Sequence, residues 1–246
     1  EYKGKEFASK QFILQISPED CTGCGVCVTA CPAKNKENPE LHAINMDHIE
    51  NHLETEKANW KFFETLPYVK RTDVVKNMPK TTQMIQPLFE FSGACAGCGE
   101  TPYIKLLTQL FGDRMVIANA TGCSSIYSGN LPTTPYCKDE KGHGPAWANS
   151  LFEDNAEFGL GMRISIDHGT AMAKSLLEGL KDQLGDIADK ILSNPQSNDI
   201  EIDAQRDNVA ALRAKLAGIN SEEAKHLSEV ADYLIKKSVW IIGGDG

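Results

Sequence analysis

The chain has 246 residues, of which 41% are hydrophobic, and a formal net charge of −9. This length suits one large or two modest domains with a sizeable core. The negative charge, without clusters of Lys and Arg, argues against a general nucleic-acid binder, and no apolar run is long enough to span a membrane. The first residues also lack the apolar region of a signal peptide, so we expect a cytoplasmic protein.

The N-terminal part predicts a small α+β domain around a group of cysteines. Residues 12–16 predict a short strand, and a Ser-Pro turn leads from it into the cysteine group. Residues 51–66 carry spaced apolar side chains among charges, which predicts a surface helix. We assign residues 1–67 to this domain and the proline-punctuated residues 68–88 to a linker.

Beyond the linker the pattern changes to alternating helix and strand. A helix capped by Thr101, with Pro102 as its first residue, is predicted to end at Gly112, and residues 115–118 follow as a short apolar strand. Residues 128–146 are rich in proline and glycine and lack periodicity. Loops of that length inside a compact domain are usually functional.

The C-terminal half is mostly helical. A long helical pattern covers residues 164–192, and two amphipathic stripes predict further helices around Leu212 and Leu227. Residues 239–242 have the pattern of a buried strand and lead directly into Gly243-Gly244-Asp245-Gly246. This order of elements indicates an α/β fold.

The first cysteine motif gives the strongest signal in the chain. It has the spacing of the bacterial ferredoxin run, in which thiolates wrap a cubane cluster and proline follows the last ligand: Cys21-x-x-Cys24-x-x-Cys27-x-x-x-Cys31-Pro32. Gly23 and Gly25 let the backbone fold closely around the cluster. Zinc and disulfides are the alternatives, but structural zinc usually pairs its ligands across a longer loop, and disulfide frameworks do not cluster in this way.

The ligation of Cys31 bears on how many clusters the chain serves. In two-cluster ferredoxins the fourth cysteine of each run binds the other cluster, so Cys31 is expected to serve a different cluster from Cys21, Cys24 and Cys27. The run occurs once, so we expect further ligands outside this chain on its N-terminal side. The alternative is that all four cysteines bind one cluster.

A second cysteine group and an aspartate lie next to the ends of predicted helices and strands. Cys95 and Cys98 precede a helix N-terminus, which favours anionic species. Cys123 and Asp245 each come just after a strand, and ligands of open α/β sheets bind beyond the carboxyl ends of strands. Thiolates suit iron and sulfide, whereas an aspartate between glycines suits magnesium with a diphosphate. Taken alone, the cysteine pair could also be a dithiol or half a zinc site, and the aspartate a plain turn.

The order of these motifs resembles the pyruvate:ferredoxin oxidoreductase family over nearly the whole chain. The resemblance rests on four segments: Cys95-Ala-Gly-Cys98-Gly-Glu100-Thr-Pro-Tyr, Gly122-Cys123-Ser124-Ser125, Pro145 to Glu157, and Gly244-Asp245-Gly246. It implies an α/β thiamine-diphosphate-binding fold, preceded by part of an α+β bacterial-ferredoxin-like domain. Residues 89–246 would then be the N-terminal part of the thiamine domain, with the magnesium motif interrupted at Gly246.

The resemblance also implies roles for individual residues. Cys95, Cys98 and Cys123 match three ligands of the cluster nearest the thiamine, and the fourth ligand of the family lies beyond Gly246. Glu100 matches a residue that contacts the cofactor. Asp245, flanked by Gly244 and Gly246, matches the aspartate that opens the magnesium and diphosphate motif. The expected cofactors are three 4Fe–4S clusters, thiamine diphosphate and Mg²⁺, and no catalytic residue is assigned.

The implied activity is oxidation of pyruvate. The family decarboxylates pyruvate with coenzyme A to acetyl-CoA and CO₂ and passes electrons through its clusters to ferredoxin or flavodoxin. The resemblance further implies that the chain works with the rest of the same enzyme, in a homodimer. The alternatives are another 2-oxoacid:ferredoxin oxidoreductase, a non-catalytic iron–sulfur electron carrier, and a zinc-stabilised interaction protein. Cys137 is an alternative fourth ligand of the second cluster that nothing near it supports, and His143 lies on the long loop, where a solvated histidine is commoner than one that faces an active site.

Overall fold

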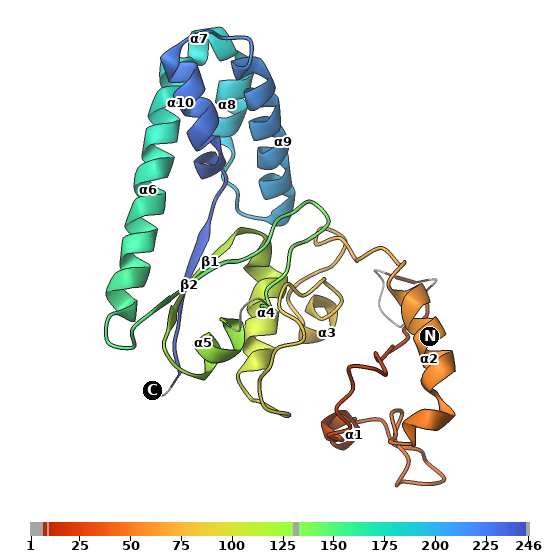
Figure 1. The fold of residues 1–246 in the computed structure, drawn as a ribbon. Coiled ribbons are helices and arrows are strands. Elements are labelled where there is room, and N and C mark those ends of the chain that lie inside the picture. Colours follow the sequence, from red (N-terminus) through yellow and green to blue (C-terminus); the bar gives the residue numbers. More distant parts are fainter. Residues whose placement is uncertain (1–6, 9, 130–132, 245–246) are drawn as a thin grey trace. The chain divides into compact units, whose positions relative to one another are not determined.

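The computed structural model describes residues 7–8, 10–129 and 133–244, and the chain divides into two compact units. The first unit comprises Glu1–Val69 with Cys95–Gly99, and the second comprises Lys70–Ala94 with Glu100–Gly246. The elements of both are labelled in Figure 1. No helix among the described residues is long and apolar enough to cross a membrane.

The first unit is small in regular structure. It contains α1 (Val26–Ala30), the short 3-10 turn η1 (Ile49–Asn51) and α2 (Leu53–Phe63), which confirms the surface helix. The strand expected at residues 12–16 is wrong, because this segment has no regular structure. It is attached to α2 by side chains instead of by backbone pairing: Gln15 Nε2 donates to Glu56 Oε2 at 2.7 Å, and Lys57 Nζ lies 2.8 Å from Glu19 Oε1.

The linker expected at residues 68–88 is wrong over most of its length. From Lys70 onward the segment belongs to the second unit. It forms the short helix α3 (Pro79–Thr82) and buries Val74, Ile85 and Leu88. Prolines punctuate the segment as they would a linker, but its apolar side chains are spaced so that they pack against the second unit.

The second unit is organised on a three-stranded parallel sheet of order β2-β1-β3. The strands are β1 (Met115–Ala120), β2 (Ala146–Ser150) and β3 (Ser238–Ile242). β1 and β3 confirm the predicted strands, although β3 buries only its last residue. β2 was not predicted, because it is short and follows directly on a loop without periodicity. Parallel pairing places the carboxyl ends of all three strands at one edge.

Helices cover both faces of this sheet. On one face, α4 (Thr101–Phe111) and α5 (Cys123–Ser128) supply Ile104 and Tyr127 to a core with Met115 and Ile117 of β1. α4 begins at Thr101 with Glu100 in the cap position, one residue earlier than expected, and it ends before Gly112 as predicted. The short 3-10 turn η2 (Gly112–Arg114) then leads into β1.

The remaining helices form a separate core that extends from the other face of the sheet. The pattern expected over residues 164–192 is divided into α6 (Asn155–Gly179), α7 (Lys181–Leu184) and α8 (Asp186–Ser193). The break follows from Gly185, whose φ of 62° leaves the helical region after α7. α9 (Asp199–Leu216), α10 (Glu222–Val230) and the turn η3 (Ala231–Leu234) confirm the two amphipathic stripes and close this core with α6 (Figure 1). The parallel sheet between helices confirms the α/β class.

Candidate cofactor and iron–sulfur sites

The ferredoxin run of the first unit folds as a loop that enters a single helical segment. Gly23 and Gly25 have φ of 71° and 73°, a left-handed conformation that strains residues with a side chain, and Gly25 is the cap of α1. The amides of Val28 and Thr29 both donate to Gly25 O at 3.1 Å. Cys21, Cys24 and Cys27 carry free, exposed thiols. The two glycines thus shape the backbone on which the predicted ligands sit.

Cys31 lies at the end of α1 in a more structured setting. Backbone hydrogen bonds, first from Ala33 and then from Ala43 and Ile44, outweigh desolvation and lower the pKa of its thiol. The segment is fixed by an isolated bridge between Lys34 and His42, and His42 Nδ1 lies 3.0 Å from Cys31 O. Backbone groups therefore favour the thiolate form, which is the form that ligates iron.

The predicted ligands do not converge on one point. Among residues 7–8, 10–129 and 133–244, no three His, Cys, Asp or Glu side chains are placed to hold a single metal ion. A 4Fe–4S cluster binds each of its four thiolates to a different iron, so its cysteines surround a volume and do not meet at a point. The cluster assignments of Cys21, Cys24, Cys27 and Cys31 stay predictions.

The second cysteine group is divided between the two units. Cys95 and Cys98 form a turn in which the amide of Cys98 donates to Cys95 O at 3.0 Å, and this turn groups with the first unit. Cys123 is the first residue of α5 in the second unit, just beyond β1, and its thiol is free and exposed. Ligation of one cluster by these three residues also stays a prediction.

The segments that follow β1 and β3 leave the sheet at the same edge. Asn119 pairs with both Asn149 and Ile242, so the three strands end within one residue of one another. Cys123 and the glycine pair 243–244 therefore start from neighbouring strands, as the sequence predicted. Asp245 and Gly246, the predicted magnesium and diphosphate residues, lie outside the described residues.

A buried polar network, which the sequence analysis did not identify, joins the three strand ends. We call it the strand-end network; it consists of Asn119, Ser124, Trp147, Ser150 and Asn155. Asn119 Nδ2 donates to Ser124 Oγ and to Ala120 O, both at 2.8 Å, and Trp147 Nε1 donates to Asn119 Oδ1 at 2.9 Å. Asn155 Nδ2 donates to Ile242 O at 3.1 Å, and Ser150 Oγ donates to Asn155 Oδ1 at 2.9 Å. An asparagine within the apolar run of β1 was the available signal.

Glu100 is the N-cap residue of α4, and one of its two carboxylate oxygens has no hydrogen-bond donor among the described residues. Its Oε1 atom is buried and accepts no hydrogen bond within the described residues. Burial raises the pKa of the nearby Tyr136 hydroxyl to about 12. A hydrogen bond with Ser128 lowers this pKa, and the charge of the Glu100 carboxylate raises it. A buried acceptor without a donor is costly unless a ligand supplies one. Glu100 therefore fits the cofactor contact that the sequence resemblance implied.

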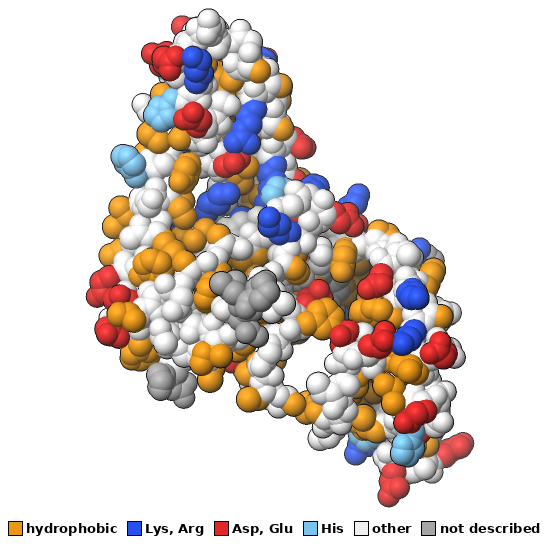
Figure 2. Space-filling model, viewed as in Figure 1, with side chains coloured by type: hydrophobic (Ala, Val, Ile, Leu, Met, Phe, Trp, Pro, Cys, Tyr) orange, Lys and Arg blue, Asp and Glu red, His pale blue; other side chains and the backbone are white. Residues whose placement is uncertain are grey.

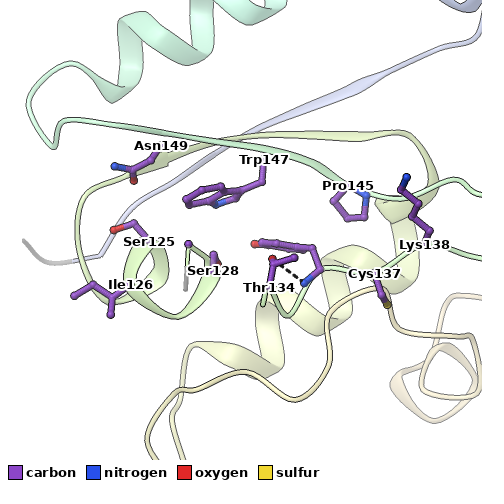
Figure 3. Close-up of a pocket in the computed structure, with 11 residues that line it drawn as sticks. Ser125, Ile126, Ser128, Thr134, Cys137, Lys138, Pro145, Trp147 and Asn149 are labelled. Carbon is purple, nitrogen blue, oxygen red and sulfur yellow. Dashed lines mark hydrogen bonds between the residues drawn. The ribbon is translucent and has the colours of Figure 1, made fainter. Parts of the chain in front are cut away.

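A cavity of about 580 Å³ is lined by Tyr136 together with residues of α5 and β2. Figure 3 shows Ser125 and Ser128 of α5 on one side of it and Trp147 and Asn149 of β2 on another. Its walls combine aromatic surface with hydroxyl and amide groups, which is the usual lining of a small-molecule site. The cavity lies in the second unit, beside the helix that begins with Cys123.

Cys137 also lines this cavity but is poorly suited to bind metal. Burial, assisted by the Glu90 carboxylate, raises the pKa of its thiol to about 11, and Sγ lies 3.7 Å from Pro87 O. The thiol is therefore protonated near neutral pH. His143 is held in a tight turn, because its amide donates to Asp139 Oδ1 at 2.8 Å. Neither residue gains a role from the structure.

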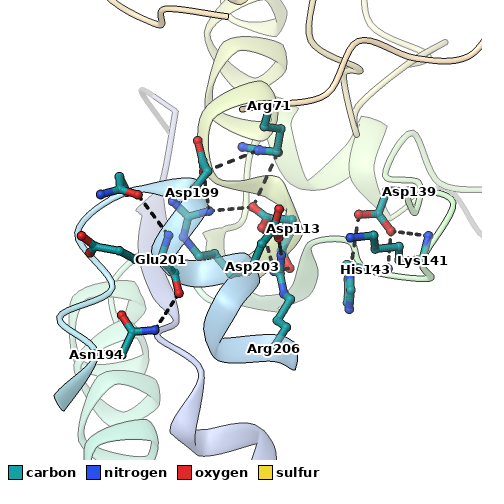
Figure 4. A network of polar contacts seen from close by, with 12 residues as sticks. Arg71, Asp113, Asp139, Lys141, His143, Asn194, Asp199, Glu201, Asp203 and Arg206 are labelled. Carbon is teal, nitrogen blue, oxygen red and sulfur yellow. Dashed lines mark hydrogen bonds and ion pairs between the residues drawn. The ribbon is translucent and has the colours of Figure 1, made fainter. Parts of the chain in front are cut away.

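A separate ion-pair network lies at the opposite end of β1. Asp113 is within 3.5 Å of Arg71, 2.8 Å of Arg114 and 2.7 Å of Arg206 (Figure 4). Burial opposes the charge of Asp113, but the three guanidinium groups outweigh it and lower the pKa of the carboxyl. Asp199 of α9 pairs with Lys76 and Arg114 beside it. This network joins the residues before α3, the start of β1, and α9.

Comparison with known proteins places these sites in a family context. The family model described as "4Fe-4S binding domain" matches residues 14–34, which include the whole ferredoxin run. The chain is 54% identical to the "Pyruvate-flavodoxin oxidoreductase" of Nostoc sp. over 99% of its length, and 54% identical to that of Rhodospirillum rubrum over 100%. It is 46% identical to the "Pyruvate:ferredoxin oxidoreductase" of Moorella thermoacetica over 99% of its length. The chain spans 21% of each of these three relatives.

Proposed function

We propose that this chain, which is related over nearly its whole length to one segment of the pyruvate:ferredoxin and pyruvate-flavodoxin oxidoreductases, provides iron–sulfur and thiamine diphosphate sites of such an enzyme. The observation that carries the proposal is the ferredoxin run in a segment matched as a 4Fe–4S domain, within a chain that aligns almost end to end. The complete enzyme converts pyruvate and coenzyme A into acetyl-CoA, CO₂, a proton and two electrons. Ferredoxin or flavodoxin receives the electrons.

The cysteines of this chain would hold the clusters that carry the electrons. Cys21, Cys24 and Cys27 would bind one cluster and Cys31 a second, while Cys95, Cys98 and Cys123 would bind a third. Backbone hydrogen bonds of the kind found at Cys31 favour the thiolate and would help to set the reduction potential of its cluster.

The second unit would hold the organic cofactor at the carboxyl edge of its sheet. Thiamine diphosphate, when bound, supplies the nucleophilic carbon that the decarboxylation of a 2-oxoacid requires. Glu100 would accept a hydrogen bond from the cofactor, and the observation in favour of this site is its buried Oε1 atom, which has no donor among the described residues. Asp245 would supply a carboxylate oxygen to Mg²⁺, which takes oxygen ligands and binds phosphates. The glycines on either side of Asp245 would let the backbone approach the diphosphate.

The test is an assay of the full-length protein with its metal content measured in parallel. We expect iron and acid-labile sulfide, and reduction of ferredoxin or flavodoxin that depends on pyruvate, coenzyme A and thiamine diphosphate. If a different 2-oxoacid has a higher kcat/KM than pyruvate, that acid is the substrate in place of pyruvate. Zinc in place of iron, or clusters without any thiamine-dependent activity, would contradict the proposal.

A further inference from the structure

The last carbonyl of β3 is the acceptor of two buried side-chain amides. Asn155 Nδ2 lies 3.1 Å and Asn119 Nδ2 3.4 Å from Ile242 O. Asn119 is 0% and Asn155 5% exposed, so both donor side chains are shielded from water. Asn155 makes the shorter contact with this oxygen, because the two hydrogens of Asn119 Nδ2 are shared among Ala120 O, Ser124 Oγ and Ile242 O. The backbone is therefore fixed at the residue where β3 ends and the glycine pair begins.

The orientation of each amide is set by a further partner. Ser150 Oγ, at the end of β2, donates to Asn155 Oδ1, and Trp147 Nε1 donates to Asn119 Oδ1, each at 2.9 Å. These contacts leave only the nitrogen of each amide to face the β3 carbonyl. Asn119 also donates to Ser124 Oγ at 2.8 Å, and Ser124 directly follows Cys123 in α5. One connected set of hydrogen bonds thus reaches the last carbonyl of β3 and the first turn of α5.

We propose that Asn119 and Asn155 are positioning residues that hold the end of β3 and the start of α5 in a fixed relation, so that the backbone leading to the candidate diphosphate residues and the thiol of Cys123 keep their spacing. This inference rests on the proposed function. Three strands of an ordinary sheet need no side-chain amides at their ends, because the backbone ladder already pairs them. The two amides lie at the strand ends that precede the candidate ligands, and both donate hydrogen bonds to backbone carbonyls there.

Asn155 is the better residue to change, because Asn119 is fully buried within the sheet. Asn155→Ala in the full-length enzyme removes one donor from Ile242 O and leaves an alanine at the first residue of α6. We expect the Kd for thiamine diphosphate at fixed Mg²⁺ to rise about tenfold, as one lost hydrogen bond can produce. Hydrogen exchange of the peptide 238–244, measured without cofactor, should become about five- to tenfold faster. Iron content should stay at the wild-type level.

Gln205→Ala is the matched control. Gln205 is also a buried amide, 1% exposed, and its Nε2 donates to Leu234 O at 3.0 Å and Ile191 O at 3.3 Å in the helical core. If the amides of the strand-end network are merely structural, both variants lower Tm and neither changes cofactor affinity selectively. We expect Tm to fall in both, with thiamine diphosphate affinity and exchange of 238–244 altered only in Asn155→Ala.

A second variant separates lost donation from lost packing. Asn155→Asp keeps the acceptor for Ser150 and places a carboxylate in the first turn of α6, where it is favourable, but it cannot donate to Ile242 O. Cofactor-free exchange of 238–244 should rise in this variant as well. Unchanged exchange in both Asn155 variants, with wild-type cofactor affinity in Asn155→Ala, overturns the inference. Failure of the wild-type enzyme to bind thiamine diphosphate would instead overturn the proposed function.

Discussion

The two units differ in what their side chains bury. In the second unit one core lies under the sheet and another within the helices α6 to α10, with Leu177, Leu184, Leu212 and Leu227 fully buried. In the described residues of the first unit no side chain is buried, and Phe12 and Ile13 are 64% and 74% exposed. Figure 2 shows hydrophobic side chains on the surface over both units.

This difference indicates two sources of stability. The second unit has enough buried apolar surface for hydrophobic burial to stabilise it. The described residues of the first unit bury no side chain, and small domains without a sufficient core usually depend on metals or disulfides; its cysteines are free. We therefore expect bound clusters to take the place of a hydrophobic core in the first unit.

The largest effect should come from removing a ligand of the ferredoxin run. Cys24→Ala is expected to abolish the cluster held by Cys21, Cys24 and Cys27, with a loss of about four irons per chain. Without it, hydrogen exchange and proteolysis across residues 10–69 should approach unfolded rates, while peptides of the second unit keep their protection. Exchange mass spectrometry with iron analysis measures both.

Cys137→Ala is the control for that comparison. Its thiol is half-buried in the second unit and protonated near neutral pH, because its pKa is raised to about 11, so the iron content should not change. Continued protection of residues 10–69 in Cys24→Ala would show that the first unit has another source of stability.

Removing Cys123 should have a more local effect. Cys123→Ala is expected to lose the cluster nearest the thiamine, again about four irons, and to leave the pair of clusters served by residues 21–31 assembled. Pyruvate-dependent decarboxylation should persist while transfer of electrons to the acceptor protein falls. Electron paramagnetic resonance of the reduced enzyme distinguishes these clusters, and simultaneous loss of all signals would speak against independent sites.

The two units also differ in how far their sequences predicted them. Periodicity found α9, α10 and β1 because each buries an apolar stripe or run, and it found β3 from an apolar run of which only Ile242 is buried. The strand expected at residues 12–16 was wrong, and the apolar side chains that suggested it stay exposed. The buried residues between Lys70 and Leu88 were missed because prolines suggested a linker, and only the tertiary fold shows that Val74 and Ile85 pack.

The candidate sites show the same division between local and non-local information. The cysteine motifs depend on spacing along the chain, and the family resemblance drawn from them is confirmed by relatives aligned along nearly the whole chain. The strand-end network brings Asn119 to Trp147, Asn155 and Ile242 across 123 positions of sequence, which no local pattern encodes. Spacing can therefore predict candidate ligands, but it does not predict the buried side chains that meet between distant segments of the chain.

A moderate effect is expected from the buried ion pairs of the second unit. Asp113→Asn leaves Arg71, Arg114 and Arg206 without their shared carboxylate and should lower the free energy of unfolding by about 3 kcal/mol. The lowered pKa of Asp113 means that its contribution is present above the unfolded-state pKa and is lost only as pH falls through the still lower folded-state pKa. The deficit should therefore be the same at pH 5 and pH 8. A deficit that disappears at pH 5 would contradict the ionised state of Asp113.

The smallest effects come from two glycines of α6, and they test how tightly the helical core is packed. A Cβ at Gly161 would meet no atom within 4 Å, whereas one at Gly169 would lie 2.7 Å from the ring of Tyr233. Gly161→Ala should therefore raise the free energy of unfolding by about 0.8 kcal/mol through helix propensity alone. Gly169→Ala should lower it by about 1 kcal/mol or more, because the aromatic ring must move in a packed interior. Denaturant unfolding, monitored by hydrogen exchange in the second unit, measures the free energy of unfolding of both variants. Equal stabilisation by the two would show that Tyr233 yields without cost, and that this core is looser than its burial indicates.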